Sequence, residues 1–131
     1  MVCLVTLFLS LQSFSQDIEL NISNIESDEG KLIIELYQGA DDFLKNPLER
    51  KIVPIHTNRA QYVFLNINPG EYAIGVIHDL DEDGELDTFL KIPREPIALS
   101  NNVKPEFGPP EYEKAKFYLK KDQRVVLSIK F

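Results

Sequence analysis

EYAIGVI, residues 71–77, is the stretch of sequence that decides the fold. Every residue after Glu71 is apolar or glycine, and the short length and the β-branched and aromatic content are typical of a strand in a protein core. The turn signal Asn68-Pro69-Gly70 stands directly before it. An acidic run, residues 79–87, begins shortly after it. The sequence therefore predicts a core strand that starts at a turn and leads into an acidic loop.

Other short segments on both sides of this strand have β-type sequence. Alternating or largely apolar patterns predict further strands over residues 17–25, 31–37, 50–56, 59–67, 116–119 and 123–131. The turn residues Ser27–Gly30 predict a hairpin between the first two, and Pro54 predicts an edge position for the third. About seven short strands, with no amphipathic helix of normal length, predict an all-β fold built as a single antiparallel β-sandwich.

The segment from Thr88 to Pro110 is rich in proline and has no clear periodicity. A stretch of this length without a pattern is unusual in a compact domain, and such loops tend to be functional or to be held by something such as an ion. The sequence therefore predicts one long Pro-rich loop. The Pro-x-Glu-Pro and Ser-Asn-Asn segments within it could fold back on the acidic run. The alternative is that the prolines stiffen the loop and the asparagines cap turns.

The N-terminus has the pattern of an export signal. Residues 1–11 are apolar and uncharged, and Ser13 and Ser15 are the small residues that a signal peptidase accepts for cleavage before Gln16. The apolar run is too short to span a bilayer. No Lys or Arg precedes it, which departs from the usual signal, and a buried N-terminal strand or helix is the alternative. We expect residues 1–15 to be a signal peptide, residues 16–131 to form a single domain, and the protein to be extracytoplasmic, either periplasmic or secreted.

Charge and cysteine content exclude several classes of function. The formal net charge of the chain is −7, and no basic patch occurs, which argues against binding to nucleic acid. Cys3 is the only cysteine, and it precedes the apolar run instead of following it, so no lipid anchor is expected. Cleavage before Gln16 would leave no cysteine for disulfides, thiol nucleophiles or thiolate metal sites.

The acidic run DLDEDGELD, residues 79–87, is the clearest sign of a chemistry. It holds six carboxylates in nine residues, and the rest of the chain is near neutral. Oxygen donors at alternate positions around a glycine are how a short loop wraps Ca²⁺. The run therefore predicts a Ca²⁺ site whose ligands are the side chains of four aspartates and one backbone carbonyl, with Gly84 at the turn: Asp79, Asp81, Asp83, Asp87 and the carbonyl of Glu85.

The run is not an EF-hand. Leu90 occupies the position of the bidentate glutamate, and a strand enters the loop where an EF-hand has a helix. The missing ligand could come from Glu95, Ser100, Asn101 or a water. A solvated acidic turn and a site for another cation remain alternatives. His78 could add a transition-metal ligand, but on a strand its side chain points away from that of Asp79, which favours a packed or surface histidine.

No catalytic motif accompanies the acidic run. An Asp-x-Asp pair after an apolar strand also occurs in phosphotransferases, but the chain is short and lacks the helices of a doubly wound fold. Gly-x-Ser-x-Gly, His-Glu-x-x-His and phosphate-cradling glycine motifs are absent from the sequence. Carboxylates are so plentiful that no pair stands out as that of a glycosidase. We therefore expect no enzymatic activity, with a metal-dependent hydrolase that uses the acidic run as the last alternative.

A family resemblance extends over most of the chain. The motifs that carry it are Pro69-Gly70-Glu71-Tyr72-Ala73, His78-Asp79, Asp83-Gly84-Glu85-Leu86-Asp87, Ile92-Pro93-Arg94-Glu95-Pro96, Ser100-Asn101-Asn102, Phe107-Gly108-Pro109-Pro110 and Ala115-Lys116-Phe117. In their order and spacing, residues 69–118 resemble the bacterial family called domain of unknown function 2141. The resemblance implies a small exported domain with an immunoglobulin-like or transthyretin-like sandwich and no established activity. The run is more acidic here, because Asp81 and Asp83 stand where the family usually carries Asn.

These patterns lead to one functional hypothesis and one alternative. We expect an exported, non-enzymatic binding or structural module in which Ca²⁺ orders the long loop. Its partner would be an unknown protein or glycan, without nucleic acid and without a membrane span. The alternative is a carbohydrate- or peptide-binding domain whose aromatic contacts, Phe89, Phe107 and Tyr112, lie on the long loop.

Overall fold

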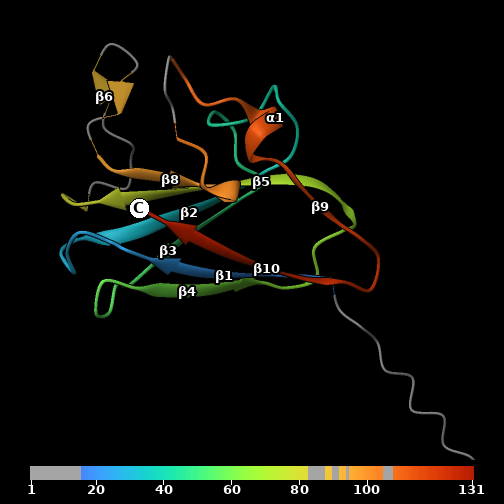
Figure 1. Ribbon diagram of the computed structural model, residues 1–131, viewed down its shortest axis with the longest axis horizontal. Helices are drawn as coiled ribbons and strands as arrows, with labels where there is room; N and C mark the ends of the chain where they lie inside the picture. Colours follow the sequence, from blue (N-terminus) through green and yellow to red (C-terminus); the bar gives the residue numbers. More distant parts are fainter. Residues whose placement is uncertain (1–15, 83–87, 90–91, 94, 105–107) are drawn as a thin grey trace, which may run out of the picture.

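The computed structural model describes residues 16–82, 88–89, 92–93, 95–104 and 108–131, and the predicted signal peptide lies outside them. Two β-sheets face each other (Figure 1). The first sheet has the order β10-β1-β4, from β1 (Asp17–Ser23), β4 (Ala60–Phe64) and β10 (Arg124–Lys130). The second has the order β3-β2-β5-β8, from β2 (Lys31–Tyr37), β3 (Glu49–Val53), β5 (Gly70–Asp79) and β8 (Ile97–Leu99). The predicted all-β sandwich is confirmed.

The remaining elements are short. Strand β9 (Phe117–Leu119) pairs with the start of β5, and β6 (Thr88–Phe89) and β7 (Ile92–Pro93) pair with each other. The helical turns are η1 (Ser100–Asn102) and α1 (Tyr112–Ala115). Among the described residues, none of the helices has the length and apolar character needed to cross a membrane.

The core between the sheets follows the alternation of the strands. Ile18, Leu20 and Ile22 of β1 are at most 1% exposed, and they pack in one cluster with the alternate residues of β2 and β5. Because successive side chains of a strand point to opposite faces, this alternation sets which side of each sheet faces inward. Burying each Ile or Leu side chain contributes about 1.5–3 kcal/mol. The apolar alternation therefore fixes both the strand positions and the orientation of the sheets.

Strand β5 is covered on both faces. Its other face packs in a second cluster with Tyr37, Phe43, Leu99 and Tyr112, on the outer side of the five-stranded sheet. The Phe43 ring meets the rings of Tyr37 and Tyr112 edge-on, at 5.5 and 5.6 Å between centroids. The turn over residues 38–46 and the segment after β8 therefore form a third layer over this sheet, next to α1 (Figure 1). This double burial explains why every residue from 72 to 77 is apolar or glycine.

The predicted hairpin between the first two strands is wrong. β1 pairs with β10 and β4, whereas β2 pairs with β3 and β5, so residues 24–30 cross from one sheet to the other. Gly30, with φ +74°, passes the end of β5 so closely that a Cβ would lie 2.2 Å from the Asp79 carbonyl oxygen. A turn signal specifies that the chain reverses, but not which sheet the next strand joins. The β1–β10 pair is also parallel, so the sandwich is not antiparallel throughout.

The Pro-rich segment is not irregular throughout. Within it β8 pairs with residues 75–77 of β5, in addition to the short β6–β7 pair. A strand of three residues is too short for its alternation to be recognised, and Pro96 precedes it directly. The edge position predicted from Pro54 is confirmed, because β3 ends at Val53 and lies at the end of its sheet.

Candidate metal centre

Asp79 is placed by the core strand itself. It is the last residue of β5, opposite Lys31 of β2, and it is only 2% exposed. By the alternation of β5, its side chain lies on the outer face of the sheet, the same face as Gly75 and Ile77. A strand that is held on both edges is a rigid support for a ligand. The sequence predicts this arrangement of a core strand that leads into an acidic loop.

Glu95 reaches the same place from the segment that precedes β8. It is 7% exposed and stands two residues before β8. Its Oε2 accepts a hydrogen bond of 2.7 Å from the backbone N–H of Leu80, and the N–H of His78 donates to the carbonyl of Pro96 at 2.9 Å. Residues 95–96 are therefore fastened to the last residues of β5, which brings the Glu95 carboxylate beside the acidic run.

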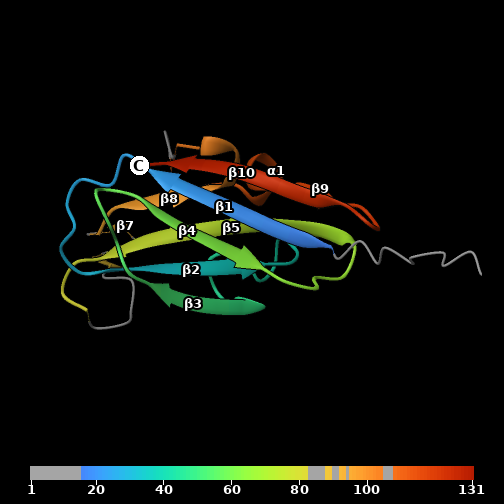
Figure 2. The ribbon, with the colours of Figure 1, turned by 90° about the horizontal axis from the view of Figure 1, so that it is seen from below.

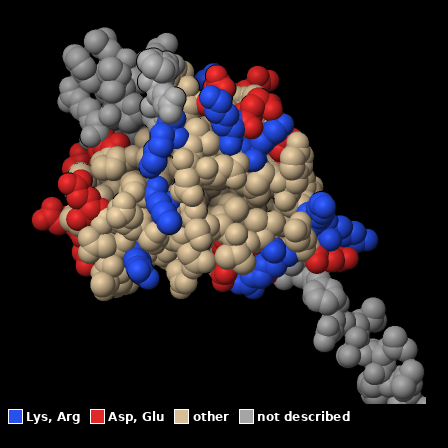
Figure 3. Space-filling view, in the orientation of Figure 1, with Lys and Arg blue, Asp and Glu red and all other residues tan. Residues whose placement is uncertain are grey.

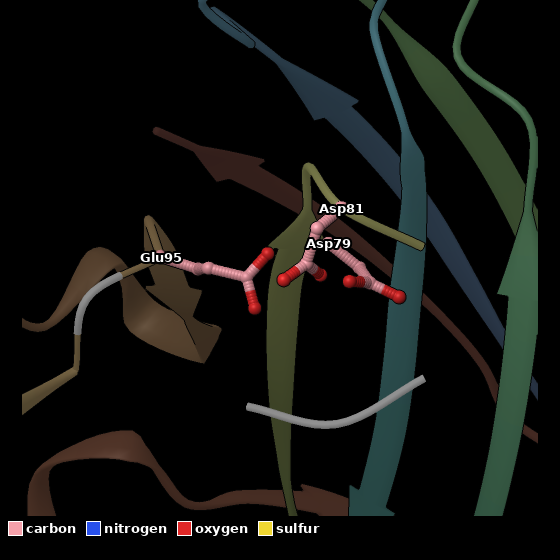
Figure 4. A group of neighbouring side chains, drawn as sticks. All are labelled: Asp79, Asp81 and Glu95. Atoms are coloured by element: carbon pink, nitrogen blue, oxygen red, sulfur yellow. The ribbon is translucent and has the colours of Figure 1, made fainter. Parts of the chain in front are cut away.

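Asp79, Asp81 and Glu95 converge. One carboxylate oxygen from each lies within 4.8 Å of the other two. Figure 4 shows Asp79 and Asp81 at the end of β5, and Glu95 approaching them from the opposite side. Two oxygens bound to one Ca²⁺ are at most about 5 Å apart, since each Ca²⁺–oxygen bond is about 2.3–2.6 Å. The three carboxylates are therefore spaced so that one cation can contact all of them.

The electrostatics of the cluster favour a cation. Three negative groups lie together, and two of them, Asp79 and Glu95, are buried. Both burial and mutual repulsion cost free energy for ionised carboxylates, and a divalent cation offsets both costs. Acidic side chains also gather at the end of the molecule where β5 finishes (Figure 3), which raises the local concentration of cations. Oxygen-only donors suit Ca²⁺ or Mg²⁺ better than softer metals.

The structure tests only part of the predicted ligand set. It brings Asp79 and Asp81 together, whereas Asp83, Glu85 and Asp87 lie outside the described residues. Of the residues proposed to complete the shell, Glu95 is at the site. The long-range contact of Glu95 could be suspected from its place in the Pro-x-Glu-Pro segment, but no local pattern fixes it.

Ser100 and Asn101 do not belong to the cluster. The buried Ser100 Oγ accepts a hydrogen bond from the Ile74 N–H at 3.0 Å and donates to the Ala115 carbonyl at 2.5 Å. It thereby provides an acceptor for the backbone N–H of Ile74, which lies between the residues of β5 that pair with β8 and those that pair with β9. Asn101 Nδ2 donates to the carbonyls of Lys114 and Lys116, at 3.0 and 2.8 Å. The prediction that Ser100 or Asn101 could complete the metal shell was therefore wrong.

Asn102 also links the segment after β8 to the first sheet. Its side-chain amide donates to the Ser128 carbonyl at 3.2 Å and accepts from the Lys130 N–H at 2.9 Å, so it binds the edge of β10 as a strand would. Asn101 and Asn102 both have positive φ angles, of 59° and 52°. Asparagine tolerates this conformation better than most residues. The Ser-Asn-Asn motif is therefore a joint between the sheets and the third layer, as the turn-capping alternative anticipated in part.

His78 is a packed histidine, as the sequence favoured. It is 1% exposed, its Nε2 donates to the Glu29 carbonyl at 2.7 Å, and its ring meets that of Phe131 edge-on. Because it precedes Asp79 on a strand, its side chain points to the opposite face of the sheet. It therefore adds no nitrogen ligand to the three carboxylates.

Of the aromatic residues proposed for ligand binding, only Tyr112 has a side chain that the structure describes, and it is buried. Tyr112 is 6% exposed and packs on Phe43, and its hydroxyl accepts a hydrogen bond from the Gly39 N–H at 3.2 Å. The expectation of a surface contact was therefore wrong for Tyr112, whose ring is more stable packed against Phe43 within the third layer. The side chains of Phe89 and Phe107 lie outside the described residues.

A small cavity of about 120 Å³ lies on the same outer face of β5. Its lining includes Glu35, Tyr37, Gly75 and Ile97. The Tyr37 hydroxyl donates a hydrogen bond to Glu35, and the Arg50 Nε lies 3.3 Å from the Glu35 carboxylate. Burial, the hydrogen bond to Glu35 and the negative charge of Glu35 raise the pKa of Tyr37, and the charge of Arg50 opposes them. This polar group is structural, since its members already bind one another.

The comparisons with known proteins identify a family but no activity. No curated protein and no solved structure matches the chain. The match to a family model covers residues 20–126, which run from β1 into β10 and include the three carboxylates. The chain therefore belongs to the family described as uncharacterized protein conserved in bacteria (DUF2141).

Proposed function

We propose that this protein is an exported, non-enzymatic binding or structural module in which a bound Ca²⁺ orders the segment between β5 and β8. The observation that carries the proposal is the convergence of Asp79, Asp81 and Glu95 within 4.8 Å, with two of the three buried. Asp83 and Asp87, with the carbonyl of Glu85, would supply further oxygens from the same run. The apolar N-terminal segment supports export.

Ca²⁺ suits this site better than the other common metals. It accepts six to eight oxygen ligands in flexible geometry, which an acidic loop and a distant glutamate can provide together. Mg²⁺ requires near-ideal octahedral geometry and gives up its waters reluctantly. Zn²⁺ prefers nitrogen and sulfur ligands, and the nearest histidine ring points to the other face of the sheet. The role of the ion would be structural, since the three carboxylates that would hold it come from two segments that are distant along the chain.

The ion would join two distant parts of the chain. It would hold the end of β5 against residue 95, and so fix the start of β8 and the third layer that follows it. A ligand that binds only the folded state stabilises it by mass action, by about 2.7 kcal/mol when its concentration is 100 times Kd. The ordered segment would then offer a defined surface to a protein or glycan partner.

Thermal unfolding tests the proposal directly. Residues 16–131 contain every strand that the structure describes and would be melted in EDTA, in increasing Ca²⁺, and in Mg²⁺ at the same concentrations. We expect a saturable rise in Tm that is specific to Ca²⁺. An unchanged Tm up to millimolar Ca²⁺ would mean that the run is only an acidic turn, and the proposal would be withdrawn.

A further inference from the structure

Strand β3 is an edge strand of the five-stranded sheet, and the described strands of the other sheet do not cover it (Figure 2). Among the described residues it has a neighbouring strand on one side only, β2, and Figure 2 shows it at the margin of its sheet, where no strand of the other sheet covers it. Arg50, Lys51 and Ile52 are exposed in succession, so both faces of the strand meet solvent. Leu48, just before the strand, is 55% exposed and Ile52 is 59% exposed. An edge with exposed apolar side chains is a template for another strand.

The sequence of this edge is complementary to itself. When two copies of Leu48-Glu49-Arg50-Lys51-Ile52 run antiparallel about a two-fold axis at Arg50, each Leu48 lies opposite Ile52 of the other copy. Each Glu49 then lies opposite Lys51 of the other copy. Opposite charges and apolar pairs that face each other across two strands are both stabilising. Symmetry repeats each favourable pair, because such an interface uses the same patch on both subunits.

The neighbouring registers lose this match. A shift that centres the axis on Glu49 or on Lys51 also places two like charges opposite each other, and it loses both pairs of Glu49 with Lys51. An axis between two residues would place a side chain of one face opposite a side chain of the other face, which a continuous sheet does not allow. In the favoured register the two Arg50 side chains approach each other, but each already pairs with Glu35 of its own chain at 3.3 Å.

We propose that the protein forms a symmetric homodimer by antiparallel pairing of β3 with β3 of a second copy, centred on Arg50. The two five-stranded sheets then continue into each other across the dimer axis. Pro47 and Pro54 flank the strand and limit the backbone pairing to a few residues, because proline has no N–H to donate. The interface is therefore short, and the dimer forms reversibly as the protein concentration rises.

Charge reversal with rescue tests this register. Sedimentation equilibrium of residues 16–131 at rising concentration would be compared for the unchanged protein, Glu49→Lys, Lys51→Glu and the double variant with both changes. Each single change replaces two attractive pairs by two repulsive ones, so we expect the dimer Kd to rise about tenfold or more. The double change restores opposite charges at both pairs, so its Kd should return to within about threefold of the original.

Control variants separate the interface from general effects of charge. Asp122→Lys makes the same charge change as Glu49→Lys at an exposed turn remote from β3 and should leave the Kd unchanged. Ile52→Glu should abolish the dimer without lowering the Tm of the monomer, since Ile52 is exposed. A protein that stays monomeric at all concentrations would overturn the proposal. So would a dimer that is insensitive to these changes, or one that the double variant does not restore.

Discussion

Replacing Glu95 by Gln should change the stability of this protein in opposite directions with and without Ca²⁺. Two unit charges 4.8 Å apart at an effective dielectric constant of about 20 repel each other by about 3.5 kcal/mol. Glu95→Gln removes this repulsion from Asp79 and from Asp81, although solvent weakens the effect of the exposed Asp81. Against it stands the weaker hydrogen bond from the Leu80 N–H to a neutral amide, a loss of about 1 kcal/mol.

In EDTA the variant should therefore be more stable than the unchanged protein. The balance of these effects is a gain of at least about 2.5 kcal/mol in the free energy of unfolding, or a Tm higher by about 10 °C. In saturating Ca²⁺ the order should reverse, because the variant has lost a charged ligand. For this reversal the affinity for Ca²⁺ should fall more than about 100-fold, which is about 2.8 kcal/mol and exceeds the gain in EDTA.

The assay is thermal unfolding of both proteins across a Ca²⁺ titration, with calorimetric titration for the affinity. Glu82→Gln is the matched control, because it removes one charge from the same acidic run at an exposed residue outside the converging group. It should leave the Ca²⁺ affinity nearly unchanged. If Glu95→Gln lowers the Tm equally in EDTA and in Ca²⁺, Glu95 only fastens the loop by its hydrogen bond, and the electrostatic reasoning is refuted.

Three further changes probe the frame around the site. Gly30→Ala should cost about 2 kcal/mol or more in circular-dichroism melts, because its Cβ would meet backbone at 2.2 Å, whereas Gly39→Ala, with φ +92° and open space, should cost only about 1 kcal/mol. Equal losses would contradict the steric argument. Ser100→Ala should cost about 1–3 kcal/mol in urea unfolding, because it leaves the buried Ile74 N–H without its acceptor; an unchanged midpoint would show that the joint is dispensable. The raised pKa of Tyr37 means that the folded state holds the phenol proton more tightly than the unfolded state, so this stabilisation is present below about pH 10 and is lost as the pH rises further. Tyr37→Phe should flatten the alkaline loss of stability in melts between neutral pH and pH 11, and an equally steep loss would contradict this assignment.

The sequence was most informative where burial imposes an alternating pattern. The predicted strand 31–37 has the observed bounds of β2, and residues 71–77 lie within β5. Local chemistry also located the edge strand, through Pro54. These features are local, because the side-chain alternation and the missing N–H of proline act within a few residues.

The features that the sequence did not reveal depend on contacts between distant segments. The turn at 27–30 does not reveal that β1 and β2 belong to different sheets, because that choice depends on which strands are available to pair. The three-residue strand β8 is recognisable only beside β5. The candidate site shows the same division. The acidic run marks Asp79 and Asp81, whereas the place of Glu95 among them results from the pairing of β8.

The parallel pairing of β1 with β10 has a consequence for when the protein folds. These strands are joined by contacts between residues that are 107 positions apart, such as the hydrogen bond from Asn24 to the Phe131 carbonyl. Of the two described strands that pair with β1, only β4 is available during synthesis until β10 has left the ribosome. Such non-local closure is slow compared with local structure formation. A chain that completes its fold this late stays unfolded for longer during synthesis, which suits the export proposed above.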